Sequence, residues 1–193
     1  MPFTWRCFNI WVVLVCLIGF PFMSAFKITG ARVPHRTEPL ETTHRIDVVI
    51  RTDRLKYSLD DTVKLDVSLQ NNIGPTIYVD RRMYWGGYGG GLKLVISDES
   101  GKPISGQFGD AIMPPPKEGD PSILIRLDQG FFYGTGLDLP ARDSFPRVGK
   151  YSIRVVYKSW LRRDFVAPQF QKLPVLWDDT PDFPSNLIWI EVE

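Results

Sequence analysis

The chain has 193 residues, of which 44% are hydrophobic and 23% charged, as expected of one globular domain with accessory segments. Lys and Arg number 23 against 22 Asp and Glu, and no Lys/Arg-rich block could follow a nucleic-acid backbone, so nucleic-acid binding is not expected. The cysteines, Cys7 and Cys16, and the histidines, His35 and His44, all precede residue 45. Because the remainder lacks the usual catalytic base and thiol nucleophile, we expect neither an enzyme nor a cofactor.

The N-terminal segment has the composition of a targeting or anchoring helix. No charge lies between Arg6 and Lys27, and the run from Ile10 to Phe20 is continuously apolar. That run suits the h-region of a signal peptide, while the whole uncharged stretch reaches the roughly 20 residues that span a bilayer. Residues 1–27 are therefore predicted to be a signal peptide or an N-terminal membrane anchor.

The orientation signal is mixed, since Lys27, Arg32 and Arg36 follow the apolar run whereas Arg6 and the terminal amine precede it. On charge alone, the remainder would face the cytoplasm. Export is nevertheless the preferred interpretation, because a short head followed by an apolar run is how secretory signals are built. We expect a secreted or membrane-anchored protein in an extracytoplasmic location, the periplasm or the cell surface.

Residues 28–44 are predicted to be a linker, since they are polar, contain Pro34 and Pro39, and show no helical or strand period. Four side chains within it have the types and spacing of a metal cluster: His35, Glu38, Glu41 and His44. A solvated linker with a proline in the middle would not fix their geometry, so no metal site is expected.

From residue 45 onward, the hydrophobic pattern is that of strands. In residues 62–71, TVKLDVSLQN, apolar and polar residues alternate, which is the period of a strand with one buried face. Similar patterns predict strands at 46–51, 76–80, 92–97, 122–127, 151–157 and 187–192, separated by segments rich in Gly, Pro and Asn. Residues 45–193 are therefore predicted to form an all-β, antiparallel sandwich of about seven or eight strands.

Three segments of this region also carry a family resemblance: YSLDDTVKLDVSLQN (57–71), GKYSIRVVY (149–157) and SNLIWIEVE (185–193). They resemble the opening, a later strand and the closing strand of bacterial extracytoplasmic immunoglobulin-like domains. A fainter similarity links the first segment to small bacterial proteinase inhibitors built on a similar sandwich, without any inhibitory residue to carry over. The resemblance implies an immunoglobulin-like fold and an envelope location.

The stretch RRMYWGGYGGGLKL, residues 81–94, is the first candidate site. A phosphate-binding loop would need its glycines to precede a helix, and here the next segment is strand-like, so nucleotide binding is not expected. Tyr84, Trp85 and Tyr88 could instead stack on sugar rings or grip a peptide. The other interpretation, that these rings pack onto the core while the glycines turn the chain, remains open.

The long connection of residues 159–186 is the second candidate, because it contains Trp160 and Trp177 among prolines and phenylalanines. These rings either cap one end of the sandwich or form a partner-binding surface. Asp178, Asp179 and Asp182 match no recognised calcium loop, so no metal is expected there either.

The combined prediction is a non-enzymatic domain that acts in protein–protein interaction or as an accessory envelope subunit. Its partner would be another envelope protein. The alternative is a carbohydrate-binding module that uses the aromatic, glycine-rich loop from Tyr84 to Tyr88.

Overall fold

A computed structural model describes residues 46–86, 91–104, 117 and 119–193. The chain divides into two units, residues 1–39 and 40–193, and all described residues belong to the second. The predicted N-terminal helix, the whole of the predicted linker and Tyr88 lie outside the described residues. No helix in the described part of the chain is both long and apolar enough to span a membrane.

Three strands form the first sheet, which we name sheet A: β1 (Asp47–Thr52), β3 (Thr62–Gln70) and β7 (Phe132–Pro140). The central strand, β3, pairs antiparallel with both neighbours, so the order is β1-β3-β7. Apolar residues at every second position of β3 are buried, and the polar residues between them lie on the outer face. This alternation gives sheet A one core face and one solvated face.

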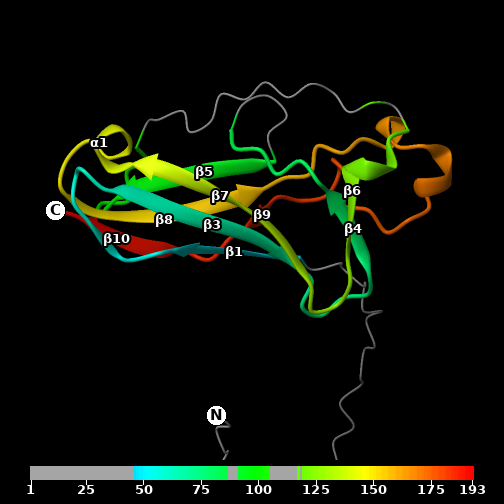
Figure 1. Cartoon of the computed structure of the whole chain (residues 1–193), viewed down its shortest axis with the longest axis horizontal. Coiled ribbons are helices and arrows are strands. Elements are labelled where there is room, and N and C mark those ends of the chain that lie inside the picture. The colour runs from blue at the N-terminus through cyan, green and yellow to red at the C-terminus, as the bar shows by residue number, and fades with distance from the viewer. Residues whose placement is uncertain (1–45, 87–90, 105–116, 118) are drawn as a thin grey trace, which may run out of the picture. The chain divides into compact units, whose positions relative to one another are not determined.

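The second sheet, sheet B, has the order β2-β10-β8-β5. Its strands are β2 (Lys56–Tyr57), β5 (Leu92–Asp98), β8 (Gly149–Tyr157) and β10 (Ile188–Val192), and β9 (Phe183–Pro184) also pairs with β8. The long pairings are antiparallel, but β10 pairs with β2 in parallel. In Figure 1, β3 and β7 of sheet A cross β5 and β8 of sheet B.

One hydrophobic core is shared by the two sheets. Sheet A contributes residues such as Ile50, Val63 and Leu65, and sheet B contributes Ile153 and Val155 among others. Burying a side chain of this size stabilises the folded chain by about 1.5–3 kcal/mol relative to leaving it exposed. The common core makes the arrangement consistent with a β-sandwich.

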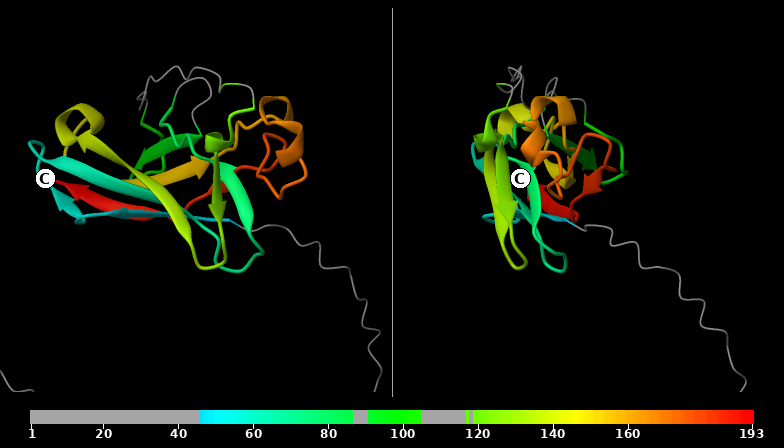
Figure 2. Two further views of the ribbon diagram at one scale, coloured as in Figure 1. Left: turned by 45° about the vertical axis from the view of Figure 1, so that its right-hand side comes forward. Right: turned by 90° about the vertical axis from the view of Figure 1, so that its right-hand side faces the viewer.

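A second, smaller core lies under the long connection after β8. There, β4 (Ile77–Asp80) and β6 (Leu124–Leu127) form a two-stranded ribbon, and Leu161, Val175 and Trp177 are buried. Short 3-10 helices at Pro121–Ile123, Arg163–Phe165 and Pro168–Phe170 complete this end. Figures 1 and 2 show the last two in orange, near β4 and β6. The only α-helix among the described residues is the four-residue α1 (Ala141–Ser144).

The coarse prediction is confirmed, because the described chain is mostly sheet with almost no helix. Ten strands are present among the described residues, more than the seven or eight predicted. The additional strands are β7 and the two-residue strands β2 and β9. The parallel pairing of β2 with β10 also departs from a purely antiparallel sandwich. Strand β7 escaped prediction because Gly134 and Gly136 interrupt the apolar–polar alternation that marks other strands.

Candidate functional site

The glycine-rich stretch returns the chain onto the start of β5. The Gly86 N–H donates to the Leu92 carbonyl at 2.8 Å, and the Leu92 N–H donates to the Tyr84 carbonyl at 3.0 Å. Gly86 has a φ of 62°, a backbone conformation that favours glycine. The described part of this stretch therefore turns the chain, and it is followed by a strand rather than a helix.

The two described aromatic residues of this stretch have different environments. The Tyr84 side chain is exposed, at 45% of its full accessibility. Trp85 is half-buried against the main core, and its indole Nε1–H donates to the carbonyl of Gly136 in β7 at 3.0 Å. Trp85 thus ties the stretch to sheet A, and Tyr84 is the ring available to a ligand.

The tryptophans of the long connection also differ. Trp160 is 39% exposed, with the Lys158 ammonium 5.5 Å from its ring centroid. Trp177 is 6% exposed and belongs to the second core, where the Arg163 guanidinium lies 5.1 Å from its ring centroid. Trp177 accordingly acts as a packing residue that caps this end of the molecule.

The fold brings Trp160 and the glycine-rich stretch together. A depression of about 320 Å³ is lined by residues from both, including Gly86, Gly91, Lys158, Trp160 and Asp182. Its residues lie far apart in the sequence, and the two predicted aromatic regions are neighbours at this point. Tyr84 and Trp177 do not line the depression.

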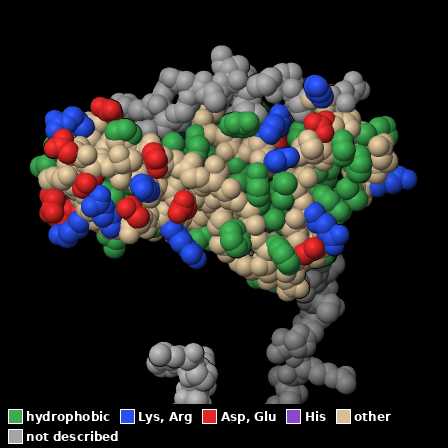
Figure 3. Space-filling view, viewed as in Figure 1, with side chains coloured by type: hydrophobic (Ala, Val, Ile, Leu, Met, Phe, Trp, Pro, Cys, Tyr) green, Lys and Arg blue, Asp and Glu red, His purple; other side chains and the backbone are tan. Residues whose placement is uncertain are grey.

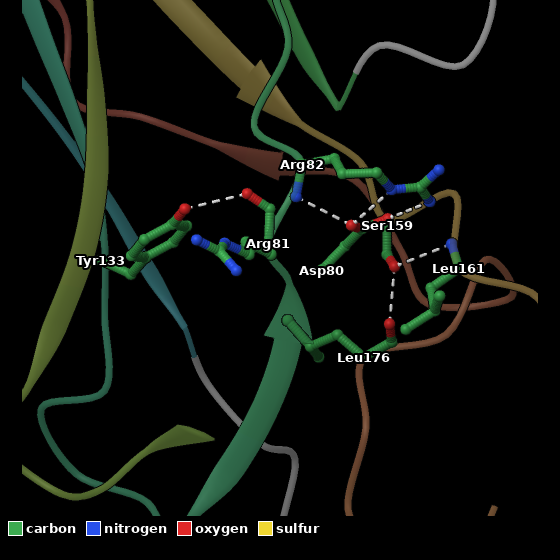
Figure 4. Close-up of polar contacts among 7 residues, drawn as sticks. All are labelled: Asp80, Arg81, Arg82, Tyr133, Ser159, Leu161 and Leu176. Carbon is green, nitrogen blue, oxygen red and sulfur yellow. Dashed lines mark hydrogen bonds and ion pairs between the residues drawn. The ribbon is translucent and has the colours of Figure 1, made fainter. Parts of the chain in front are cut away.

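A cluster of polar contacts lies where the end of β4 meets the long connection, as Figure 4 shows. The Asp80 carboxylate is buried and accepts hydrogen bonds from Arg82 Nε at 2.9 Å and from the second guanidinium nitrogen at 2.7 Å. Ser159 donates to the Leu176 carbonyl at 2.6 Å and accepts from the Leu161 N–H at 3.3 Å. Backbone hydrogen bonds join the two segments: the Tyr78 N–H donates to the Pro174 carbonyl, and the Leu176 N–H donates to the Tyr78 carbonyl, both at 2.9 Å.

One buried hydroxyl near this cluster is unsatisfied. Tyr157 is 1% exposed, and its Oη has no hydrogen-bond partner among the described residues. Burial raises the pKa of Tyr157 well above its usual range, and the negative charge of Asp80 raises it further. The phenol therefore remains neutral at physiological pH.

Sequence patterns gave no indication of a groove that lies on the outer face of sheet A. We name it the sheet A groove; its volume is about 580 Å³. Its lining comes from all three strands and from the turn before β7, and includes Val49, Arg51, Asp66, Ser68, Gln70, Asn72, Phe131, Phe132, Gly134 and Gly136. The exposure of Phe131 and Phe132 was not predicted, although the FF pair in the sequence could have drawn attention to it.

The turn that carries Phe131 is held by hydrogen bonds at both ends. The Gly130 N–H donates to the Asn71 carbonyl at 2.7 Å, and the Phe131 N–H donates to the Asp128 carbonyl at 3.0 Å. The hydroxyl of Thr76 donates to the Asp128 carboxylate at 2.6 Å. That hydrogen bond, together with Arg126, lowers the pKa of Asp128, so the turn is anchored by a carboxylate that stays ionised at neutral pH.

A second exposed surface lies on sheet B. We name it the Trp189 patch; its depression of about 470 Å³ is lined by Leu55, Lys56, Glu99, Lys150, Trp189, Ile190 and Glu191. Trp189 and Leu55 are 48% and 61% exposed. Lys56 and Glu191 form an ion pair at 3.0 Å, which raises the pKa of the lysine and lowers that of the carboxylate. The patch thus combines an aromatic centre with a charged rim.

Comparisons with known proteins find matches among solved structures but none among protein families or curated proteins. No protein-family model and no curated protein matches the sequence. Among solved structures, the β-glucosidase from Listeria innocua in complex with glucose is 9% identical, with a TM-score of 0.33, over 76% of this chain and 16% of that one. The same enzyme in complex with isofagomine is 10% identical, with a TM-score of 0.32, over 76% of this chain and 16% of that one. Similarities at this level carry no argument about fold or activity.

Proposed function

We propose that this chain is a non-enzymatic, immunoglobulin-like domain, exported or tethered to a membrane, that binds another protein. The uncharged N-terminal run supports export or tethering. Two sheets around one core support the immunoglobulin-like interpretation. The position of both histidines and both cysteines before the first strand supports a binding role over catalysis.

The observation that carries this proposal is the exposed Trp189 on the outer face of β10. A tryptophan on a strand is held by the sheet, so its ring can be buried by a partner at little cost in conformational entropy. Strand register places Trp189 opposite Ser152 of β8, and Leu55 and Ile190 line the same depression. An aromatic centre with a charged rim is the composition of many protein interfaces.

The charges around Trp189 are of both signs. Lys150 lies next to Glu191 in the strand register, and Arg154 lies one row beyond Trp189 on the outer face of β8. Lys93 of β5 is also exposed. It lies two residues before Val95, the half-buried residue that pairs with Arg154. The depression itself is lined by two cations, Lys56 and Lys150, and two anions, Glu99 and Glu191, so its rim offers charges of both signs to a partner.

Cross-linking in the source cells would test this proposal. A photoreactive phenylalanine analogue replaces Trp189 in the full-length chain, and the matched control carries it at Lys64, which is exposed on sheet A. We expect a discrete protein adduct from position 189 and none from position 64. The partner, once purified, should bind Trp189→Ala at least about tenfold more weakly than the unmodified chain.

Two results would contradict the proposal: identical adducts from both positions, or unchanged affinity of the partner for Trp189→Ala. Export or tethering has its own measurement, since the chain should fractionate with membranes or outside the cytoplasm. Recovery of the full-length chain in the cytosol would contradict that part alone.

The alternative function, a carbohydrate-binding module using the loop from Tyr84 to Tyr88, has support from the exposure of Tyr84. The indole of Trp85 is already engaged with Gly136. If the loop binds sugar, Tyr84→Ala should abolish that binding while leaving the partner's affinity unchanged.

A further inference from the structure

The sheet A groove owes its depth to glycine at two neighbouring outward positions of β7. Strand pairing creates cross-strand rows, so Val49, Ser68 and Gly134 share one row, and the next contains Arg51, Asp66 and Gly136. With no side chain on β7 in either row, the outer face is hollow there. The groove is thus built into the strand register.

A hydrogen-bonded chain of polar side chains runs along the β3 side of the groove and ends at Asp47 of β1. Gln70 Nε2 donates to Ser68 Oγ at 3.0 Å, and Asn72 Nδ2 donates to Asp47 Oδ2 at 3.0 Å, with a longer contact of 3.5 Å to Gln70 Oε1. These contacts fix the planes of both amides before a ligand arrives, which lowers the entropic cost of binding. An amide offers donors and acceptors side by side, as neighbouring sugar hydroxyl groups require.

Two exposed phenyl rings stand beside this polar chain. Phe131 is 63% exposed and Phe132 is 70% exposed, and Phe132 lies in the same cross-strand row as Gln70. The face of an aromatic ring carries partial negative charge, so it attracts the C–H groups on the flat side of a pyranose. Figure 3 shows hydrophobic side chains gathered at the end of the molecule near β4 and β6, from which β7 begins.

The groove has no excess of cations, and Asp47 beside it adds a negative charge. Among its described lining residues, Arg51 and Asp66 are the charged ones, and they are direct neighbours across β1 and β3. A groove for phosphate or another anion would need an excess of cations. Neutral hydrogen-bonding groups without an excess of cations fit a neutral, hydroxyl-rich ligand.

We propose that the sheet A groove binds a neutral oligosaccharide, with sugar rings against Phe131 and Phe132 and hydroxyl groups on Ser68, Gln70 and Asn72. A volume of about 580 Å³ falls within the range of roughly 300–1,000 Å³ found for small-molecule sites. This activity is separate from protein binding at the Trp189 patch, because the two surfaces lie on different sheets.

The test uses the full-length chain in detergent, probed with an array of neutral oligosaccharides of glucose, mannose, galactose, xylose and N-acetylglucosamine. Calorimetric titration of the best ligand follows. Phe132→Ala and Gln70→Ala should each weaken binding at least about tenfold. Trp189→Ala, the matched control on sheet B, should bind as tightly as the unmodified chain.

Thermal unfolding of each variant checks the fold, and Gly136→Ala provides a second approach, since its methyl group would fill the groove without removing any contact. That variant should also bind sugar at least about tenfold more weakly. The proposal is overturned if no neutral oligosaccharide binds, if only peptides or anionic glycans bind, or if the groove variants bind normally. Loss of binding in Tyr84→Ala alone would place the sugar site on the glycine-rich stretch and overturn it as well.

Discussion

Alanine at Gly134 should destabilise the domain, whereas alanine at Gly136, two residues along the same strand, should not. A Cβ at Gly134 would overlap the carbonyl oxygen of Val67 and lie 3.3 Å from both Cα and Cβ of Ser68. Those atoms belong to β3, the central strand of sheet A, which cannot move without disturbing both neighbours. At Gly136 the nearest atoms are Asp66 Oδ1 at 3.4 Å and the Leu65 carbonyl oxygen at 3.8 Å, which are ordinary contacts.

The expected magnitude combines two opposing effects. Overpacking that shifts the backbone costs about 1–3 kcal/mol. Alanine also restricts the unfolded chain, which stabilises the folded state by about 0.4–1 kcal/mol wherever its conformation fits. Gly134→Ala should therefore lower the free energy of unfolding by about 1–2 kcal/mol, and Gly136→Ala should leave it unchanged or raise it by up to about 1 kcal/mol.

Urea unfolding followed by tryptophan fluorescence measures both free energies, and thermal unfolding provides a second measurement. For a domain of this size, each kcal/mol corresponds to a shift of about 2–4 °C in Tm. Equal stabilities of the two variants would refute the reasoning. An equal loss in both would show that β7 needs glycine for its backbone freedom, and not for close approach to β3.

Three further predictions concern individual polar groups. Asn71 is 1% exposed and its amide bonds Pro75, Leu127 and Gly74, so Asn71→Ala should cost about 2–4 kcal/mol in urea unfolding. Asn72→Ala, at an exposed position, is the control. If Asn71→Ala lowers the free energy of unfolding as little as this control does, Asn71 does not stabilise the fold in this way. Tyr157→Phe removes an unpaired buried hydroxyl, so its Tm should equal or exceed that of the unmodified chain, and a lower Tm would show that the hydroxyl has a partner. Burial raises the pKa of Tyr57 to about 12, so the folded chain keeps a proton that the unfolded chain loses near pH 10. The resulting stabilisation is complete below pH 10 and is lost as the pH rises toward 12. Between pH 10 and 12, the urea midpoint of Tyr57→Phe should therefore fall less than that of the unmodified chain. An equal fall in both would contradict the prediction.

Several strands could be predicted from their own residues. The segment Val63–Leu69 alternates apolar and polar side chains, and in the structure its apolar members all face the core. Strand β8 was predicted from the same signal, and so was β10, although one of its outward positions holds the apolar Trp189. The alternation of apolar and polar residues is a local property of each strand. It can therefore be recognised without knowing which element covers the buried face.

Whether each aromatic side chain is exposed or buried could not be predicted from such a local pattern. Tyr84 and Trp85 are adjacent in the sequence, yet one is exposed and the other bonds β7. Trp160 and Trp177 lie in one connection, but only Trp177 enters the second core. In a segment without a regular period, the direction of a ring depends on contacts with distant residues.

The sequence by itself determined the strand-rich character of residues 46–193, because alternation and turn residues act locally. It also places the histidines and cysteines before the first strand. Only the tertiary structure decided that β1, β3 and β7 lie side by side and that Gly134 and Gly136 open a groove between Ser68 and the phenylalanines. Strands far apart in the chain come together through burial of a shared core, and the pattern of any one strand does not specify its neighbours.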